Sequence, residues 1–229
     1  MRSVIYLAVA AVVTLLSGCD PFEKQRAEQA EKTRIECLDK ICPGDVVPTR
    51  DHMKEVVFKK NGKWFLMPKQ FGDPNFGAIA FYWPSKTPKT GRPDGKDYPE
   101  RGKAFDQTAI EIFIRSINEG YETTRQTLEK AEVSGKVTNR VMVKPGLERV
   151  NIQSDHRAFY VATKLTGLDG KPPVMACAHD YPSHDGGTSF VWKPGISVGA
   201  GGNQKHCTDW PEIYPEIINV LNQIKETQP

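Results

Sequence analysis

The sequence predicts an α+β fold: a mainly antiparallel β-sheet domain with a C-terminal helix and one short surface helix, stapled by disulfides. Three observations predict it. Short runs rich in β-branched and aromatic residues recur between residues 56 and 193, separated by Gly, Pro or Asn clusters. Apolar residues at helical spacing, Ile213, Ile217 and Leu221, occur near the C-terminus. Four cysteines remain besides the one at residue 19, an even number that suits disulfides.

The composition narrows the class of protein. A formal net charge of +3 over 229 residues is close to neutral, so the chain lacks the basic excess of a nucleic-acid-binding protein. No polybasic cluster for anionic lipid is visible in the sequence either. The length suits a single globular β-rich domain, residues 37–229, preceded by a signal peptide, residues 1–18, and a tether, residues 19–36.

The first residues have the parts of an export signal. Arg2 is followed by an apolar run from Val4 to Leu16 that is too short to span a bilayer as a folded helix, and small residues follow. An ordinary secretion signal with an unrelated cysteine, or a transmembrane anchor, is the competing interpretation. Asp20 and the polar residues after it end the apolar run abruptly, which argues against both.

The run Leu16-Ser17-Gly18-Cys19 resembles the lipobox of bacterial lipoproteins. The resemblance implies cleavage before Cys19, lipidation of its thiol and new amino group, and a place in the cell envelope facing the periplasm. Two or more acyl chains give stable membrane anchoring. Asp20 resembles the signal that keeps lipoproteins at the inner membrane of enteric bacteria, which favours the inner membrane; other lineages read that position differently, so the outer membrane stays open.

The tether and the first cysteine pair follow. Residues 21–36 are charged and almost devoid of large apolar side chains, which is typical of a solvated tether, helical or not. Cys37 and Cys42 then open the folded body. Four residues separate them, whereas thioredoxin-like redox motifs have two, so we do not expect redox chemistry here.

An exported chain with four cysteines predicts two disulfides. Three pairings of Cys37, Cys42, Cys177 and Cys207 exist, and we favour the first with the second and the third with the fourth, because each pair lies within one half of the chain. The chain-entropy model gives about 3.7 kcal/mol for the larger loop and about 2.2 kcal/mol for the smaller. Loss of the larger bridge should therefore matter more.

Strand signals dominate the central sequence. Two β-rich runs around Asn61-Gly62 predict a hairpin. Residues 76–83 are typical of a buried strand that ends at Pro84, and alternating isoleucines predict a strand over residues 110–114. Polar residues 121–132 favour a surface helix. Further strands are expected at residues 140–143, 148–152, 158–165, 173–178 and 189–193.

The last sixty residues contain a glycine run and the C-terminal helix. Residues 199–202, Gly-Ala-Gly-Gly, lack the Lys-Ser/Thr of a P-loop and the context of a dinucleotide site, so a flexible turn is expected. Asp209 followed by Trp210-Pro211 predicts a helix start with an Asp cap and an early proline. The helix that follows should dock one apolar face on the sheet.

Candidate chemistry concentrates between Cys177 and Cys207. With His179 and His184 these cysteines form a conceivable zinc ligand set, but a disulfide in an oxidising compartment competes for the same sulfurs. No Gly-x-Ser-x-Gly element is present for nucleophilic catalysis. We therefore expect no enzyme, with no catalytic residues, no metal and no cofactor.

Two polar loops are the candidate binding segments. Residues 85–103 contain many prolines, glycines and lysines and are unable to form a core, and a long irregular loop in a compact domain is usually either functional or mobile. A second loop spans residues 181–188. The candidate partner-binding residues in the two loops are Lys86, Lys89, Arg92, Lys96, Tyr98, Tyr181 and His184.

Three patches are similar to small lipoproteins associated with type VI secretion lipase effectors and taken to be their immunity proteins: residues 83–85, Trp-Pro-Ser; residues 192–199, Trp-Lys-Pro-Gly-Ile-Ser-Val-Gly; and residues 207–214, Cys-Thr-Asp-Trp-Pro-Glu-Ile-Tyr. The resemblance implies a periplasmic, membrane-tethered protein that binds and occludes a protein toxin without catalysis. It supplies no contact residues. The alternatives are a lipoprotein that binds a small ligand or an envelope component, and a metal-dependent hydrolase.

Overall fold

The computed structural model describes residues 21–89, 108–153, 157–178 and 185–229, and the chain divides into two compact units, residues 1–38 and 39–229. The described part of the first unit consists of helix α2, Pro21–Glu36, and the two turn residues after it; the α2 side chains from residue 22 onward are all exposed. An ion pair of 2.7 Å between Glu31 and Arg34 lies along it. The charged tether is therefore a helix without a buried face.

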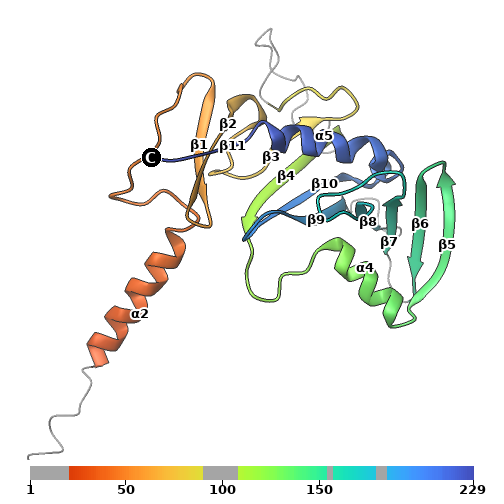
Figure 1. Ribbon diagram of the computed structural model, residues 1–229, viewed down its shortest axis with the longest axis horizontal. Coiled ribbons are helices and arrows are strands. Elements are labelled where there is room, and N and C mark those ends of the chain that lie inside the picture. The colour runs from red at the N-terminus through yellow and green to blue at the C-terminus, as the bar shows by residue number, and fades with distance from the viewer. Residues whose placement is uncertain (1–20, 90–107, 154–156, 179–184) are drawn as a thin grey trace, which may run out of the picture. The chain divides into compact units, whose positions relative to one another are not determined.

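The second unit contains two antiparallel sheets, so the predicted fold class is confirmed (Figure 1). The smaller sheet has the order β1 (Glu55–Lys60), β2 (Lys63–Pro68), β11 (Lys225–Thr227). The larger sheet has eight strands in the order β3 (Ile79–Tyr82), β4 (Ala109–Ser116), β10 (Ile196–Asn203), β9 (Asp185–Lys193), β8 (Val174–Ala178), β7 (Arg157–Ala162), β6 (Leu147–Ile152), β5 (Val137–Lys144).

The β1–β2 hairpin forms where the sequence predicts it. Lys60 lies opposite Lys63, so Asn61 and Gly62 make a two-residue turn. Their φ angles are 48° and 72°, and a tight hairpin turn of this kind requires positive φ at both positions. Asn and Gly are the residues that adopt this backbone with the least strain, which is why the prediction succeeded.

Among the described residues, two α-helices, α4 (Thr124–Val133) and α5 (Trp210–Asn222), pack on the large sheet. The short 3₁₀ turn η1 (Lys69–Phe71) connects β2 to β3, and η2 (Gln204–Asp209) connects β10 to α5. Helix α4 begins with a capping box in which Thr123 and Gln126 exchange side-chain and backbone hydrogen bonds. Helix α5 runs across the strands in Figure 1. The apolar face predicted for α5 is buried, at Ile213, Ile217, Leu221 and, just beyond its end, Ile224.

Helices α4 and α5 cover opposite faces of the large sheet. Alternate residues of a strand point to opposite faces. In β7, Tyr160 and Ala162 belong to the main core that contains α5, whereas Phe159 and Val161 belong to a smaller core with Leu128 of α4. Strand β7 is therefore buried on both sides, which explains its continuous apolar sequence.

The glycine run 199–202 is a central strand and not a flexible turn, so that prediction was wrong. It forms part of β10, which pairs with both β4 and β9. A Cβ on Gly201 would lie 2.6 Å from the carbonyl oxygen of Gly186, and one on Gly202 would lie 2.6 Å from that of Ala109. Glycine is therefore required at these two positions because the neighbouring backbones approach closely. In the sequence, a glycine-rich strand of this kind looks the same as a glycine-rich loop.

Several other bounds differ from the prediction. Strand β7 ends at Ala162 and not at residue 165, and β9 begins at Asp185 and not at residue 189, so the last part of the predicted loop 181–188 is a strand. Strand β3 begins at Ile79, and Phe76 lies outside it with 91% of its surface exposed. Asp209 precedes α5, but its side chain makes no capping hydrogen bond, because the carboxylate is bound elsewhere. Strand β11 was not predicted either, because three residues are too few to show the alternation of apolar and polar side chains that indicates a strand.

Two disulfides are present. Cys177 in β8 is bonded to Cys207 in η2, and both side chains are buried. Cys37 and Cys42 are the other disulfide-bonded cysteines. Within the described ranges, no helix is both long enough and apolar enough to cross a membrane.

Candidate partner-binding surface

Antiparallel pairing places several strand connections at one end of the large sheet. Tyr82 at the end of β3 lies opposite Ala109 at the start of β4, and Asn203 at the end of β10 lies opposite Asp185 at the start of β9. The end of β8 likewise lies beside the start of β7. Both segments in which the sequence predicts partner-binding residues are attached to strand ends in this region.

Only two of the predicted contact residues lie within the described residues, namely Lys86 and Lys89. Both belong to the turn that follows β3. The remaining predicted residues fall outside the described residues: Arg92, Lys96, Tyr98, Tyr181 and His184, together with the proposed lipidation residue Cys19.

The turn after β3 folds back on its own strand. The peptide bond between Trp83 and Pro84 is cis, and Lys86 has a φ of 59°. The Lys86 N–H donates to the Tyr82 carbonyl at 2.6 Å, and the Lys89 N–H donates to a β3 carbonyl at 2.9 Å. This edge of the large sheet is therefore closed by backbone hydrogen bonds from the same chain.

Two lysines bind acidic residues of α5. Lys86 Nζ lies 3.2 Å from Glu216 Oε2 and 6.0 Å from the centre of the Trp83 ring. Lys144 Nζ, from the end of β5, lies 3.0 Å from Glu212 Oε1. Because all four charged ends are partly exposed, these pairs contribute little stability and leave charged groups at the surface.

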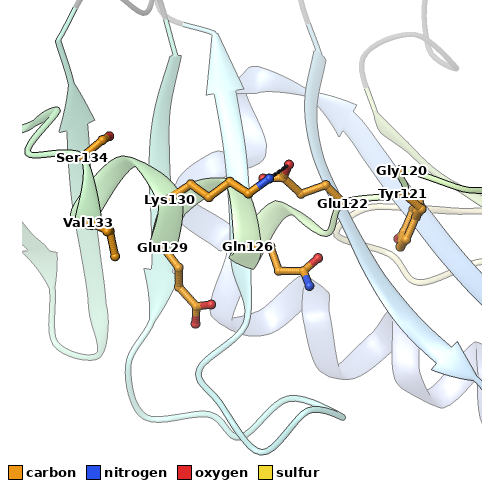
Figure 2. A pocket seen from close by; sticks show the side chains of 8 residues that line it. All are labelled: Gly120, Tyr121, Glu122, Gln126, Glu129, Lys130, Val133 and Ser134. Atoms are coloured by element: carbon orange, nitrogen blue, oxygen red, sulfur yellow. Dashed lines mark hydrogen bonds and ion pairs between the residues drawn. The ribbon is translucent and has the colours of Figure 1, made fainter.

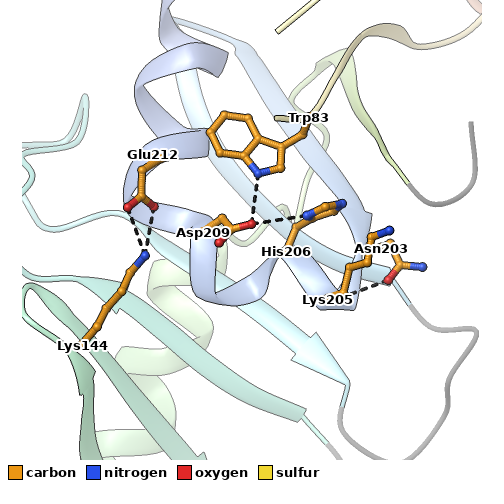
Figure 3. Close-up of polar contacts among 7 residues, drawn as sticks. All are labelled: Trp83, Lys144, Asn203, Lys205, His206, Asp209 and Glu212. Carbon is orange, nitrogen blue, oxygen red and sulfur yellow. Dashed lines mark hydrogen bonds and ion pairs between the residues drawn. The ribbon is translucent and has the colours of Figure 1, made fainter. Parts of the chain in front are cut away.

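Asp209 joins three elements at the centre of this surface (Figure 3). Its Oδ2 accepts a hydrogen bond from Trp83 Nε1 at 3.0 Å and lies 3.4 Å from His206 Nδ1. The imidazole is buried, whereas the Asp209 side chain is 38% exposed. The carboxylate thus orients an indole from the β3 turn and an imidazole from η2 next to the buried disulfide.

The same cluster offers limited chemistry. An Asp–His pair is the orienting half of a catalytic triad, but the thiol beside it, Cys207, is bonded to Cys177. In the described ranges no group of three or more His, Cys, Asp or Glu side chains is arranged to hold a metal ion. The visible role of Asp209 is to fix the positions of Trp83 and His206.

A broad depression of about 580 Å³ lies along the outer face of α4 (Figure 2). Glu122 and Lys130 form an ion pair of 2.6 Å across it, and the Lys130 hydrogen bond holds the pKa of Glu122 below its ordinary value. The hydroxyl of Tyr121 is buried without a hydrogen-bond partner among the described residues. Val133 at the other end is 91% exposed.

A second, narrower cleft of about 260 Å³ lies where β8 and β9 separate. The two strands pair only at Ala176 and Gly187. Beyond that point Thr124 Oγ1 of α4 accepts the Ser189 N–H at 2.8 Å, and Arg125 donates to the Pro172 carbonyl. The start of α4 thus replaces the missing strand pairing.

The inner wall of this cleft is aromatic. Tyr214 and Phe190 meet edge to face, with ring centres 5.8 Å apart. The Tyr214 hydroxyl accepts the Leu168 N–H at 3.2 Å, and burial raises the pKa of Tyr214. An apolar wall with a few fixed polar groups is the usual character of a small-molecule pocket.

Sequence reasoning placed Asp209 at the start of a helix and did not connect it with Trp83 and His206. Trp83 and Asp209 are 126 positions apart in the sequence and meet only in the folded chain, so no local pattern indicates the contact. The acidic partners on α5, Glu212 and Glu216, were also missed, because polar positions of an amphipathic helix give no local indication of what they contact.

The comparisons with known proteins agree with the fold. No protein-family model matches the chain, and no curated protein sequence matches it. Among solved structures the chain is similar to Smlt3025, described as an immunity protein of the Stenotrophomonas maltophilia type IV secretion system. The TM-score is 0.50 at 14% identity, and the match covers 76% of this chain and 94% of that one. The two proteins share a fold.

Proposed function

We propose that this protein is an immunity protein that binds and neutralises a cognate secreted toxin. The observation that carries the proposal is the fold that it shares with a secretion-system immunity protein over most of both chains. Such a role needs an accessible binding surface and no catalysis of its own. It is consistent with the sequence resemblance, which also points to immunity proteins.

The proposed site of action is the periplasm, with the protein held to the membrane by lipid on Cys19. The lipobox-like run ending at Cys19 supports this location, and Asp20 favours the inner membrane if enteric sorting applies. We further propose a type VI lipase effector as the toxin, on the sequence patches alone. The structurally similar protein is described as belonging to a type IV system, so the shared fold does not identify the secretion system that delivers the toxin. The toxin gene next to this one would identify it.

The proposed toxin-binding surface is the end of the large sheet around Asp209. It presents the partly exposed Lys86 and Glu212 side chains and the exposed Lys205 on a framework fixed by Trp83. The loop residues predicted from sequence are proposed to extend this surface. Mixed charges around a fixed aromatic centre are typical of specific protein interfaces.

The test is to express the toxin gene that neighbours this one in the periplasm, with and without this protein. We expect growth arrest without it and normal growth with it, and a stable complex of the purified proteins. Arrest that persists in the presence of well-expressed, folded protein would reject the immunity function. A neighbour that is a lipase supports the finer assignment.

A lipoprotein that binds a small ligand is the second candidate, and the cleft between β8 and β9 favours it. Native mass spectrometry of the purified protein would show a bound small molecule in this case. Val191→Trp fills the cleft from its exposed end, so the bound species should then disappear. Metal analysis of the same sample separates the immunity protein and the ligand-binding lipoprotein from a metal-dependent hydrolase, because only the hydrolase should contain a stoichiometric metal ion.

A further inference from the structure

A third cavity, of about 550 Å³, lies beside the outer edge of β1. Its walls come from four separate stretches of the first part of the domain, which the sequence alone does not bring together. Four cations and two exposed apolar side chains are among the residues that line it: Lys40, Arg50, Lys60, Lys69, Ile41 and Phe76. We call these six residues the Phe76 face.

The acidic residues in the same cavity have structural tasks. Asp39 accepts the Asn61 N–H at 3.0 Å, and Asp73 accepts the Asn75 N–H at 2.9 Å. Glu55 accepts the backbone N–H of a nearby turn at 3.1 Å. The donors in these bonds are uncharged, so the three carboxylates stay negative beside the four cations of the Phe76 face, and the cavity lining carries an excess of one positive charge.

The apolar residues are unusually exposed for their size. Phe76 is 91% exposed and Ile41 is 39% exposed. Met53, in the turn that carries the cavity-lining His52, is 84% exposed. Burying a side chain of this size is worth about 1.5–3 kcal/mol, so a cluster left in water indicates that another surface covers it.

The mixture of cations and apolar side chains on the Phe76 face indicates what kind of surface would cover it. Lysine and arginine beside large apolar side chains suit the boundary between headgroups and acyl chains, where apolar groups insert and cations meet phosphates. The chain position agrees, because the cavity begins at Asp39, directly after the tether. Helix α2 spans 16 residues, or about 24 Å, so lipid on Cys19 would keep Asp39 near the bilayer.

We propose that the Phe76 face binds the surface of an anionic phospholipid bilayer. Phe76 and Ile41 insert at the interface, and Arg50 contacts a lipid phosphate. The Lys60 ammonium donates to the Asp39 carbonyl at 3.3 Å and contacts a phosphate with its remaining N–H groups. The tether holds Asp39 near the bilayer only if Cys19 carries the proposed lipid, whereas contact between the Phe76 face and lipid does not require the anchor. Anchor and face together would attach the protein at two points and restrict its orientation on the membrane.

The experiment uses the mature chain from residue 19 with Cys19→Ser, so that binding is independent of lipidation. Co-sedimentation is measured with vesicles of phosphatidylcholine alone and with vesicles containing one third phosphatidylglycerol. We expect binding to the anionic vesicles that weakens as salt rises. Each of Arg50→Ser and Lys60→Ser should weaken it about fivefold, which corresponds to about 1 kcal/mol per cation. Phe76→Ser should weaken it at least as much.

Val133→Ser is the matched control. Val133 is 91% exposed, like Phe76, but belongs to α4, so its replacement should leave vesicle binding unchanged. Circular dichroism and thermal unfolding confirm that each variant is folded. The proposal fails if the parent protein ignores anionic vesicles, or if the Phe76-face variants bind as the parent does.

Neutralisation of the toxin by the same unlipidated protein is measured in solution without vesicles. Loss of neutralisation in Phe76→Ser with intact vesicle binding would assign the face to the toxin and overturn the proposal. Because the vesicle assay contains no toxin, its failure would leave the immunity function standing. Conversely, failure to neutralise would not affect the vesicle result.

Discussion

The indole of Trp83 and the carboxylate of Asp209 lie 126 positions apart in the sequence and are joined by a hydrogen bond of 3.0 Å from Nε1 to Oδ2. One residue follows β3 and the other precedes α5, so the bond ties the edge of the large sheet to the C-terminal helix. The same carboxylate contacts His206, which adjoins the disulfide. Asp209 therefore organises the surface that we propose for toxin binding.

Removing this carboxylate should weaken both the fold and the interface. Asp209→Ala leaves the Trp83 Nε1–H without its acceptor, and we expect a loss of about 1–3 kcal/mol in the free energy of unfolding, measured by urea denaturation. Trp83→Phe tests the same bond from the other side. A double-mutant cycle with a coupling energy near zero would contradict the account, and Asp209→Asn should recover part of the loss because it retains an acceptor.

The larger disulfide should be the more important of the two. Cys177 and Cys207 are 30 residues apart, so the chain-entropy model gives about 3.7 kcal/mol for their bond. The predicted bond between Cys37 and Cys42 would close a much smaller loop, for which the same model gives about 2.2 kcal/mol. Replacing each pair by serine and comparing urea midpoints checks the order. A greater loss from the Cys37 and Cys42 double variant would reverse it.

Gly186 should tolerate no side chain. A Cβ there would lie 2.7 Å from Met175 Cε, 2.9 Å from Cys207 Sγ and 3.0 Å from Cys177 Sγ. Gly186→Ala should therefore lower stability by about 1–3 kcal/mol, the usual range for overpacking, and slow oxidation of the two thiols. Gly199→Ala is the matched control, since its nearest neighbour would be 3.9 Å away. Equal melting temperatures of the two variants would disprove the steric argument.

Asp45 should contribute an acid-sensitive part of the stability. The Cys42 N–H, and then the Lys59 ammonium at 3.0 Å, hold the pKa of Asp45 below its ordinary value of 3.8. Its contribution is therefore complete above that value and is lost as the pH falls through the lower folded pKa. Wild type should be more stable than Asp45→Asn at pH 6, and the difference should vanish in strong acid.

Urea midpoints from pH 6 to pH 2.5 measure this difference. Glu119→Gln removes an exposed negative charge and serves as the control for the loss of charge itself. A gap between wild type and Asp45→Asn that stays constant over the whole range would contradict the assignment.

Lipidation should matter in the cell and not in solution. Cys19→Ala removes the proposed anchor, so protection against the toxin should fall because the protein loses its high local concentration at the membrane. Affinity for the purified toxin should stay unchanged. Full protection by the soluble variant at equal expression would show that anchoring is dispensable.

The binding surface was only partly predictable. Lys86 and Lys89 were proposed from loop composition, but their turn is fixed by backbone hydrogen bonds to β3 and by Glu216 of α5. These contacts join residues that are distant in the sequence, where neither periodicity nor turn chemistry gives a signal. The Phe76 face was missed for the same reason, and Phe76 itself was assigned to a buried strand because an apolar run does not reveal where the strand starts.

Features that depend on near neighbours follow from the sequence. Asn61-Gly62 specified a hairpin through local backbone preference, the isoleucines of β4 specified a strand through their alternation, and helical spacing specified the buried face of α5. Tertiary structure placed residues 199–202 in a central strand, because only the approach of neighbouring strands excludes a Cβ at Gly201 and Gly202. It also decided that Asp209 binds Trp83 and does not cap its helix, because hydrogen-bond geometry depends on a residue brought close by the fold.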